Sequence, residues 1–496
     1  MTLLAHGADT LTRDALAVLQ PGFEGTTAPA WLLRQVGEGL TAVGLFGRNI
    51  ASPGQLAALT AQLRAERDDV LVAIDEEGGD VTRLEVRGGS SFPGNLALGA
   101  VDDTGLTRDV ARELGRRLAE CGVNLNWAPS ADVNSNPDNP VIGVRSFGAD
   151  TRLAARHTAA YVEGLQAAGV AACTKHFPGH GDTNVDSHHA LPRIDADLDT
   201  LAARELVPFK AAIAAGTKAV MSAHILVPAL DPTRPATLSP QILTGLLRKE
   251  LGYEGLIVTD GMEMNAIAGT YGIERGSVLA IAAGADAICV GGGLADEATV
   301  LRLRDALVAA VREGALPAER LADAAARVRE LASWTRQARA AAAPGAPQEG
   351  SAPGIGLAAA RRALVITGTA EPVTAPYVAT LAPVANIAVG DETPWGVAAE
   401  LAALVPGTAS GVFPEGATAA DVLAAAGERT VVMVVRDAHR HPWMAQALEA
   451  LVEARPETVV VEMGVPRAEP RGALHIATHG ASRVCGRAAA ELIAGT

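Results

Sequence analysis

Short apolar runs alternate with helix-like windows through the first two thirds of this 496-residue chain, and this alternation constrains the fold most strongly. Each run has the length of a strand, is apolar on both faces and is bounded by Gly, Asp or Pro. Strands of this kind, separated by helices, form a parallel sheet that helices cover. Seven or eight such units within about 330 residues predict a TIM-type (β/α)8-like barrel. The runs are residues 42–47, 70–74, 123–128, 170–174, 219–223, 255–259 and 287–291, and the helical windows include 104–121 and 151–168.

The organisation of the chain changes near residue 336. Residues 336–356 are rich in Ala, Pro and Gly without periodicity, which predicts an interdomain linker. Beyond it, further apolar runs and helical windows predict a smaller α/β layered C-terminal domain. We therefore predict a catalytic barrel over 1–335, a linker over 336–356 and a C-terminal α/β domain over 357–496. The strand-like runs of the second domain are 362–368, 385–390, 430–435, 458–464 and 474–480, and its helical windows are 395–404, 418–426, 443–453 and 482–494.

Composition excludes several classes of protein. A net charge of −15 repels phosphate backbones, so the chain is not expected to bind nucleic acid. No uninterrupted apolar stretch is long enough for a membrane span, and the first residues do not resemble a signal peptide. The four cysteines lie far apart in mostly apolar surroundings, which indicates buried thiols in a reducing compartment. We expect a soluble, cytoplasmic protein.

Titratable residues follow four of the apolar runs. Asp75 follows residues 70–74, and Lys175 and His176 follow 170–174. His224 and Asp260 come after the two runs near 220 and 257. In a parallel barrel, active sites lie at the carboxyl ends of the strands, where the βα loops converge. These residues therefore predict one shared pocket at that end of the barrel.

The densest group of polar residues lies in a loop at 175–189, where Pro and Gly exclude a regular helix. Asp186 and His188 are two residues apart, so in an extended segment the carboxylate can orient the imidazole. Such a histidine can act as general acid and then as general base, while Asp260 supplies a separate nucleophilic carboxylate. A metal-dependent hydrolase is a second interpretation of this loop. It is less favoured, because no helical His pair can span Pro-Gly and no remote carboxylate cluster accompanies the loop.

Five blocks of sequence carry a family resemblance. The string KHFPGHGDTNVDSHHALP, which begins at Lys175, resembles the signature of the glycoside hydrolase family 3 β-N-acetylglucosaminidases. The other blocks are AIDEEGG at 73–79, NWAPSADVNSNPDNPVIGVRSFG at 126–148, VMSAHI at 220–225 and LSPQILTGLLRKELGYEGLIVTDGMEM at 238–264. They occur in the order typical of the family and cover most of the first domain. The C-terminal part resembles the second α/β domain of two-domain members.

The resemblance implies roles for individual residues. Asp260 corresponds to the catalytic nucleophile, His188 to the acid/base of the N-acetylglucosaminidase branch, and Asp186 to the dyad partner of that histidine. A neutral pyranose would be bound by carboxylates that accept hydrogen bonds from hydroxyls and by cations that donate them. The residues at the sugar-binding positions of the family are Asp75, Arg83, Arg145, Lys175 and His176.

Two residues depart from the pattern of the family. Asp80 stands where many relatives carry Arg, and Gly261 follows the predicted nucleophile where others often carry a polar residue. The glycines of 291–293 resemble a phosphate-cradling turn, although an ordinary βα turn is the favoured interpretation. His180 and Asp182 are expected to shape the loop that carries the acid/base.

These observations predict a retaining exo-β-N-acetylglucosaminidase that needs no cofactor and no metal. Its expected partner is a small carbohydrate, an N-acetylglucosaminide from cell-wall muropeptides or chitin fragments, and the chain is expected to be a monomer or homodimer. Phosphorolysis by the same residues stays open, because a histidine, unlike a glutamate, does not repel an incoming phosphate. A non-catalytic sugar-binding protein on a barrel scaffold is the alternative from another class.

Overall fold

The structure is a computed structural model that describes residues 2–185, 191–341, 354–384, 389–390 and 392–496. The chain divides into two compact units. Unit 1 consists of Met1–Glu76, Thr107–Pro140 and Asp150–Ser351. Unit 2 consists of Glu77–Leu106, Val141–Ala149 and Ala352–Thr496. Two segments from the first part of the chain thus belong to the same unit as the C-terminal part, and the predicted boundaries at 335 and 357 stay a prediction.

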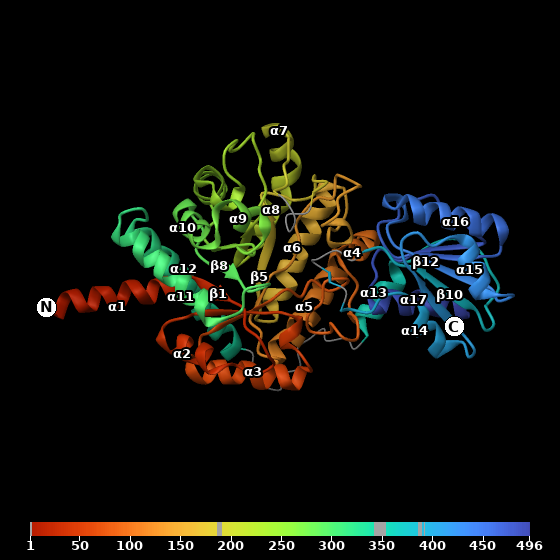
Figure 1. Cartoon of the computed structure of the whole chain (residues 1–496), viewed down its shortest axis with the longest axis horizontal. Helices are drawn as coiled ribbons and strands as arrows, with labels where there is room; N and C mark the ends of the chain where they lie inside the picture. Colours follow the sequence, from red (N-terminus) through yellow and green to blue (C-terminus); the bar gives the residue numbers. More distant parts are fainter. Residues whose placement is uncertain (1, 186–190, 342–353, 385–388, 391) are drawn as a thin grey trace. The chain divides into compact units, whose positions relative to one another are not determined.

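The described residues of unit 1 contain eight short strands, and helices surround them (Figure 1). Strands β2 to β7 form one sheet in sequential order with every neighbouring pair parallel. β1 pairs with β8 in parallel, and a parallel bridge from Val258 to Ala287 links the β7 strand to the segment before β8. The predicted parallel barrel is confirmed. The strands are β1 (Leu19–Pro21), β2 (Ala42–Leu45), β3 (Leu71–Ile74), β4 (Leu125–Asn126), β5 (Ala171–Phe177), β6 (Ala219–Ser222), β7 (Leu256–Thr259) and β8 (Ile288–Val290).

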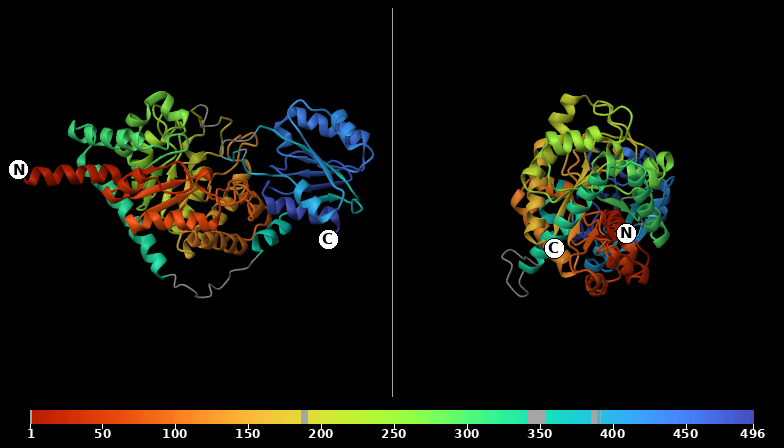
Figure 2. Two further views of the ribbon diagram at one scale, coloured as in Figure 1. Left: turned by 60° about the horizontal axis from the view of Figure 1, so that its bottom comes forward. Right: turned by 90° about the vertical axis from the view of Figure 1, so that its left-hand side faces the viewer.

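The helices of unit 1 follow the strands along the chain, and α1 packs against α11 and α12 (Figure 2). Both helical windows quoted from the sequence correspond to helices, α5 and α6. The principal helices are α1 (Thr2–Ala17), α2 (Ala30–Glu38), α3 (Pro53–Glu66), α5 (Thr104–Glu120), α6 (Thr151–Ala167), α8 (Leu206–Ala214), α9 (Asn265–Tyr271), α10 (Ile273–Ala283), α11 (Glu297–Arg312) and α12 (Ala318–Ala341). The other helical segments are α7 (Leu198–Thr200), η1 (Gly47–Asn49), η3 (Leu201–Glu205), η4 (Ala236–Leu238) and η5 (Gln241–Glu250).

Small and medium side chains fill the barrel. Ala73, Cys173 and Ala219 lie in this core, and Trp127 is its largest member. Val328 and Leu331 of α12 belong to the same cluster, so α12 covers one end of the barrel interior. Since close packing of such residues leaves little space, the ligand site of the barrel has to be built by the loops at the strand ends.

Unit 2 contains a six-stranded sheet in the order β11-β10-β12-β13-β14-β9. All neighbouring pairs are parallel except β14 and β9, which are antiparallel, so the sheet is mixed. Its strands are β9 (Val365–Gly368), β10 (Tyr377–Leu381), β11 (Ala409–Phe413), β12 (Val431–Val435), β13 (Val459–Glu462) and β14 (Leu474–Ala477). Its helices are α4 (Asn95–Val101), α13 (Ile355–Arg362), α14 (Ala398–Leu404), α15 (Ala419–Ala426), α16 (Pro442–Ala454) and α17 (Arg483–Ala494), with η2 (Gly143–Arg145) and η6 (Ala438–Arg440). The predicted α/β architecture of this part is confirmed.

Some details differ from the sequence-based expectation. Residues 336–341, expected in the linker, are helical because α12 continues to Ala341. Residues 342–353 and four residues of the predicted strand at 385–390 lie outside the described part of the chain. Within the described residues, no helix is both long enough and apolar enough to cross a membrane.

Candidate active site

Asp75 and Lys175 form an ion pair at the carboxyl ends of the barrel strands. Asp75 follows the last residue of β3, and Lys175 lies inside β5. The Lys175 Nζ atom is 2.5 Å from Asp75 Oδ1. The lysine side chain is 3% exposed and that of the aspartate 20%. Because a buried ammonium group needs a counter-charge, Asp75 stabilises Lys175 while its own carboxylate stays more open to a ligand. The structure thus brings two of the predicted substrate-binding residues together.

His176, the next residue of β5, is oriented by a carboxylate that the sequence analysis did not single out. Asp132 Oδ2 is 2.7 Å from His176 Nδ1, and both side chains are buried. Burial opposes ionisation of Asp132, but the charge of His176 and its hydrogen bond outweigh that effect and hold the pKa of Asp132 far below its usual range. The ionised carboxylate only accepts hydrogen bonds, so His176 carries a proton on Nδ1. Asp132 lies in the loop after β4, six residues beyond the end of the strand, so the strand-end criterion did not identify it.

Asp260 directly follows β7 and is partly exposed. Its backbone N–H donates to the Ser222 carbonyl at 3.1 Å, which ties it to the end of β6. Its Oδ1 atom accepts a hydrogen bond from the Gly261 N–H at 2.8 Å. Both contacts orient the side chain from the backbone, so the carboxylate is held at the strand end where the sequence predicts a nucleophile.

The charges of Asp75 and Asp260 both raise the pKa values of two buried thiols in the barrel. Burial raises the pKa of Cys173; Lys175 opposes this rise, and the charges of Asp75 and Asp260 add to it. Burial likewise raises the pKa of Cys289, and Glu263, Asp260 and Asp75 act in the same direction. Both carboxylates directly follow barrel strands, Asp75 after β3 and Asp260 after β7, so they lie at the same end of the barrel.

The loop after β5 is fixed by contacts on both sides. Asn139 Nδ2 donates to the carbonyls of His180 and Gly181 at 2.9 and 3.0 Å. A Cβ atom at Gly181 would lie 1.7 Å from the Val133 carbonyl oxygen, so only glycine fits this close approach. Arg204 Nη2 is 2.5 Å from Asp182 Oδ2. The first part of the loop is therefore held in one conformation.

His180 has a second role in this loop through its charge state. Its backbone N–H donates to Asp132 Oδ1 at 2.7 Å, and its ring is buried. Burial, followed by the neighbouring His176, lowers the pKa of His180 to about 4. A ring with this pKa is neutral near pH 7, so His180 shapes the loop without adding charge to the site.

The predicted acid/base pair lies outside the described residues. Asp186 and His188 both fall in 186–190, and the described chain ends at Val185 and resumes at Leu191. The Val185 N–H donates to Thr183 Oγ1 at 3.1 Å, which orders the turn that leads to this segment. The roles of Asp186 and His188 stay predictions.

The remaining two predicted sugar-binding residues belong to unit 2. Arg145 is buried, with Nη2 2.7 Å from Glu77 Oε1 and Nη1 3.2 Å from the Val141 carbonyl oxygen. Arg83 is half-buried and lies in the turn that follows Val81. The other described site residues, Asp75, Lys175, His176 and Asp260, belong to unit 1. Glu77 holds the Arg145 guanidinium and was overlooked, although it lies in the AIDEEGG block.

The glycine turn at 291–293 holds a carboxylate of the chain itself. Glu263 Oε1 accepts hydrogen bonds from the N–H groups of Gly291, at 2.9 Å, and of Gly292. Such a concave row of backbone N–H groups binds anions, and here Glu263 is the anion. The turn is therefore a structural contact that fixes the segment after Asp260.

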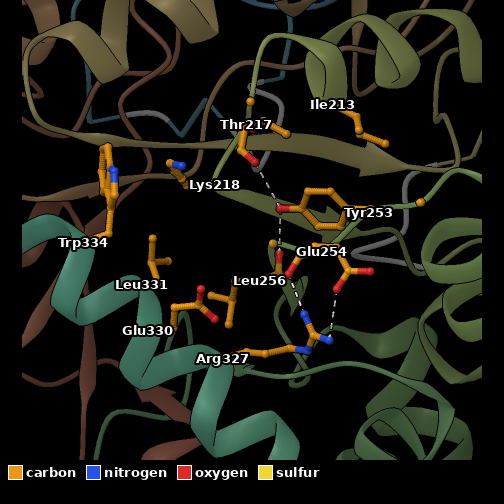
Figure 3. Close-up of a pocket in the computed structure, with 13 residues that line it drawn as sticks. Ile213, Thr217, Lys218, Tyr253, Glu254, Leu256, Arg327, Glu330, Leu331 and Trp334 are labelled. Atoms are coloured by element: carbon orange, nitrogen blue, oxygen red, sulfur yellow. Dashed lines mark hydrogen bonds and ion pairs between the residues drawn. The ribbon is translucent and has the colours of Figure 1, made fainter.

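A pocket of about 380 Å³ lies at the amino ends of β6 and β7, and none of the predicted site residues is among its lining (Figure 3). Tyr253 points across it, and its hydroxyl lies within hydrogen-bond distance of the Thr217 and Leu256 carbonyls. The Lys218 ammonium lies 5.1 Å from the centre of the Trp334 ring. This pocket lies between α12 and the amino ends of the strands. The predicted site residues lie at the other end of the barrel, at the carboxyl ends of the strands.

The described residues contain no group of three or more His, Cys, Asp or Glu side chains arranged to hold a metal ion. The predicted loop also carries His188 and His189, which lie beyond the described part.

Comparison with protein families agrees with this geometry. The model of the glycosyl hydrolase family 3 N-terminal domain matches residues 27–331. β-Hexosaminidase A of Pseudoalteromonas piscicida is 37% identical over 324 residues, which are 60% of this chain and 54% of that protein. The matched part is thus about half the length of that relative. The β-hexosaminidase of Neisseria meningitidis serogroup C is 36% identical over 254 residues, 50% of this chain and 70% of that protein.

A solved structure resembles the chain over nearly its whole length. It is the glycoside hydrolase family 3 β-N-acetylglucosaminidase from Paenibacillus sp. str. FPU-7, with a TM-score of 0.86 and 35% sequence identity. The match covers 98% of this chain and 96% of that chain. Both parts of the present chain therefore have counterparts in one solved protein.

Proposed function

Because the chain belongs to glycosyl hydrolase family 3, we propose that it is a retaining exo-β-N-acetylglucosaminidase. The observation that carries the proposal is the Asp260 carboxylate at the end of β7, on the same barrel edge as the Asp75–Lys175 pair and His176. The similarity to proteins named β-hexosaminidase and β-N-acetylglucosaminidase supports the choice of sugar.

In the proposed reaction Asp260 attacks the anomeric carbon and forms a glycosyl-enzyme intermediate. His188, oriented by Asp186, protonates the glycosidic oxygen as the bond to the leaving group breaks. His188 then takes a proton from water, which attacks the anomeric carbon and releases the sugar with retained configuration. The protein's own residues supply every proton transfer, so the proposal includes no cofactor and no metal.

The charged residues of the rim bind the terminal sugar in this proposal. Asp75 accepts hydrogen bonds from hydroxyls, and Lys175 donates one beside it. His176 is oriented for contact with the sugar by its Nδ1 hydrogen bond to Asp132. The roles of Arg83 and Arg145, which belong to unit 2, stay those that the resemblance to the family implies. The substrates are N-acetylglucosaminides from muropeptides or chitin fragments, hydrolysed in the cytoplasm.

The decisive experiment uses a chromogenic aryl N-acetyl-β-glucosaminide. The wild type should release the aryl group, and NMR should detect the β-anomer of N-acetylglucosamine first. Asp260→Ala should abolish turnover and should prevent labelling by a fluorinated mechanism-based inactivator. Ordinary turnover by Asp260→Ala would contradict the assignment of the nucleophile.

The same assay separates hydrolysis from phosphorolysis. Product analysis on chitobiose and on a muropeptide disaccharide, with and without phosphate, should give free N-acetylglucosamine in both cases. Formation of a sugar 1-phosphate only when phosphate is present would replace hydrolysis by phosphorolysis. The Gly291–Gly293 turn does not favour a phosphate site, since Glu263 occupies its N–H groups.

A further inference from the structure

His224 is fully buried two residues beyond β6, and both of its ring nitrogens meet named partners. Nε2 lies 2.9 Å from the carbonyl oxygen of Gly261, the residue after the proposed nucleophile. Nδ1 lies 2.8 Å from the hydroxyl oxygen of Thr237 in η4. His224 therefore connects the polar interior of the barrel to the backbone beside Asp260.

Gly261 is held at both ends by hydrogen bonds. Its N–H donates to Asp260 Oδ1 at 2.8 Å. Its carbonyl oxygen accepts from His224 and also from the Met264 N–H at 3.1 Å. Glycine has the most conformational freedom of any residue, so external contacts decide the direction in which its N–H points. The hydrogen bond from His224 thus restrains Gly261, whose N–H orients the Asp260 carboxylate.

The identity of the acceptor determines which nitrogen of His224 is protonated. A carbonyl oxygen cannot donate, so Nε2 must carry the hydrogen of the bond to Gly261. In a neutral ring Nδ1 then accepts from the Thr237 hydroxyl, which in turn accepts from Ser222 Oγ at 3.0 Å. The Thr237 hydroxyl has a second acceptor in the Ala223 carbonyl at 2.9 Å. If its proton goes there, Nδ1 must itself be protonated to donate to Thr237, and Nε2 remains a donor in both arrangements.

We propose that His224 is a positioning residue for the glycosidase reaction. By holding the Gly261 carbonyl, it keeps the Gly261 N–H on Asp260 and fixes the carboxylate in the orientation that attacks the anomeric carbon. The inference rests on the proposed role of Asp260. A nucleophile whose orientation is lost reacts more slowly in both chemical steps, while the binding of the sugar changes little.

Two substitutions separate the contacts of the two ring nitrogens. Asn places its amide near the Nδ1 position, and Gln reaches the position of Nε2. His224→Asn should lower kcat about 10²-fold with KM within about twofold, because the Gly261 contact is lost. His224→Gln should restore most of kcat, because its amide N–H can donate to the same carbonyl.

His157 provides a matched control in the same unit. It is buried, and its Nδ1 lies 2.8 Å from Thr107 Oγ1, between α6 and α5. His157→Asn should lower the melting temperature and leave kcat per folded enzyme unchanged. A purely structural role of His224 would give the same result for His224→Asn.

The leaving group distinguishes His224 from the acid/base. The loss in His224→Asn should be similar for aryl glycosides with good and poor leaving groups, since the nucleophile is affected. The rate of labelling by the mechanism-based inactivator should fall by the same factor. A loss confined to substrates with poor leaving groups would assign His224 to proton transfer and overturn the proposal.

Two other results overturn it. One is that His224→Asn folds and has the kcat of the wild type. The other is that kcat falls equally in His224→Asn and His224→Gln. If the Asn variant does not fold, Thr237→Val and Thr237→Ser decide instead. A loss of kcat at constant KM in the Val variant alone supports the proposal, and equal behaviour of the two overturns it. Failure of the wild type on N-acetylglucosaminides would overturn the proposed substrate, and any other glycoside cleaved through Asp260 then serves in the same test.

Discussion

The two parallel sheets of this protein use the carboxyl ends of their strands in different ways. At the barrel edge of unit 1, side chains pair with side chains: Lys175 with Asp75, and His176 with Asp132. At the carboxyl ends of the strands in unit 2, a side chain forms hydrogen bonds with backbone N–H groups. Glu462 at the end of β13 accepts hydrogen bonds from three N–H groups, those of Asp437, Ala438 and Gly464. Both edges are polar, but the residues proposed for catalysis lie at the barrel edge.

The difference lies in the role of the charge. A carboxylate that accepts several backbone N–H groups fixes a loop and has little capacity left for a ligand. A carboxylate paired with a lysine, as Asp75 is, can exchange part of that contact for a sugar hydroxyl. The side chain of Asp75 is also more exposed than that of Glu462, which is 1% exposed. The partners and the exposure of a strand-end carboxylate, and not its position alone, therefore distinguish the two edges.

Asp80 is a second structural carboxylate of unit 2, with one side-chain partner and one backbone partner. Its Oδ2 atom is 2.6 Å from Arg436 Nη2, and its Oδ1 atom accepts the Ala481 N–H at 2.7 Å. The resemblance to the family implies Arg at this position in many members, whereas Asp80 here forms a buried ion pair. The departure noted in the sequence is thus accommodated by Arg436 in the same unit.

The largest expected effect is a loss of activity on substitution of Asp260 at the barrel edge. Asp260→Asn keeps the size and polarity of the side chain but removes the nucleophilic charge, so kcat/KM should fall at least ~10⁴-fold. The melting temperature should change little because the carboxylate is partly exposed. Steady-state kinetics and thermal unfolding measure the two quantities. A variant that loses stability in proportion to activity would break the contrast between the two edges.

In unit 2, replacing the buried carboxylate of Asp80 should affect the stability of the protein. Asp80→Ala leaves the Arg436 guanidinium without its buried counter-charge, which should lower the free energy of unfolding by about 3–5 kcal/mol. Urea denaturation measures this change. The matched control is the exposed pair Arg471–Glu449, where Glu449→Gln should cost less than about 1 kcal/mol. Equal effects of the two substitutions would contradict a structural role for Asp80.

Glu462 should make the stability of the protein depend on pH. Burial, followed by the charge of Asp437, raises the pKa of Glu462 from 4.5 to about 7. The folded state therefore binds the proton more tightly than the unfolded state, so this contribution is complete below pH 4.5 and is lost as the pH rises through 7. The difference in unfolding free energy between wild type and Glu462→Gln should change by up to about 3 kcal/mol across this range. Parallel pH profiles of the two proteins would refute the linkage.

Two lysines at opposite ends of the barrel sharpen the comparison within unit 1. Lys175→Met keeps the length of the side chain but leaves Asp75 without its ammonium partner, so kcat/KM should fall about 10²-fold. Lys218→Met, in the pocket at the strand starts, should retain wild-type activity. Kinetics on the aryl glycoside decides between them. Similar losses in both variants would mean that Lys175 acts only through the general stability of the barrel.

Most of the strands were predictable because buried parallel strands are continuous apolar runs. β1 was missed because it is three residues long and follows α1 directly. β11 was missed because it is an edge strand with small, partly exposed residues, which weakens the apolar signal. β10 was also missed, although all five of its residues are buried. The prediction instead placed a strand at 385–390, of which the described residues, Val389 and Gly390, lie outside any strand.

The site was predictable to the extent that it depends on the residues immediately after a strand. Asp75 and Asp260 could be identified from their positions after apolar runs. The partners Asp132, Glu77 and Glu263 were not identified, because each lies in a loop and contacts residues 28 to 68 positions away. A local pattern contains no information on such contacts.

The sequence by itself determined most of the order of helices and strands in unit 1, the parallel barrel and the residues at its strand ends. These depend on apolar periodicity and on chain neighbours, which the sequence contains directly. Only the tertiary structure decided which carboxylate holds Lys175, which one orients His176, and that Glu263 fills the glycine turn. Hydrogen bonds and ion pairs form only within about 3 Å and in suitable directions, so they depend on how distant segments pack.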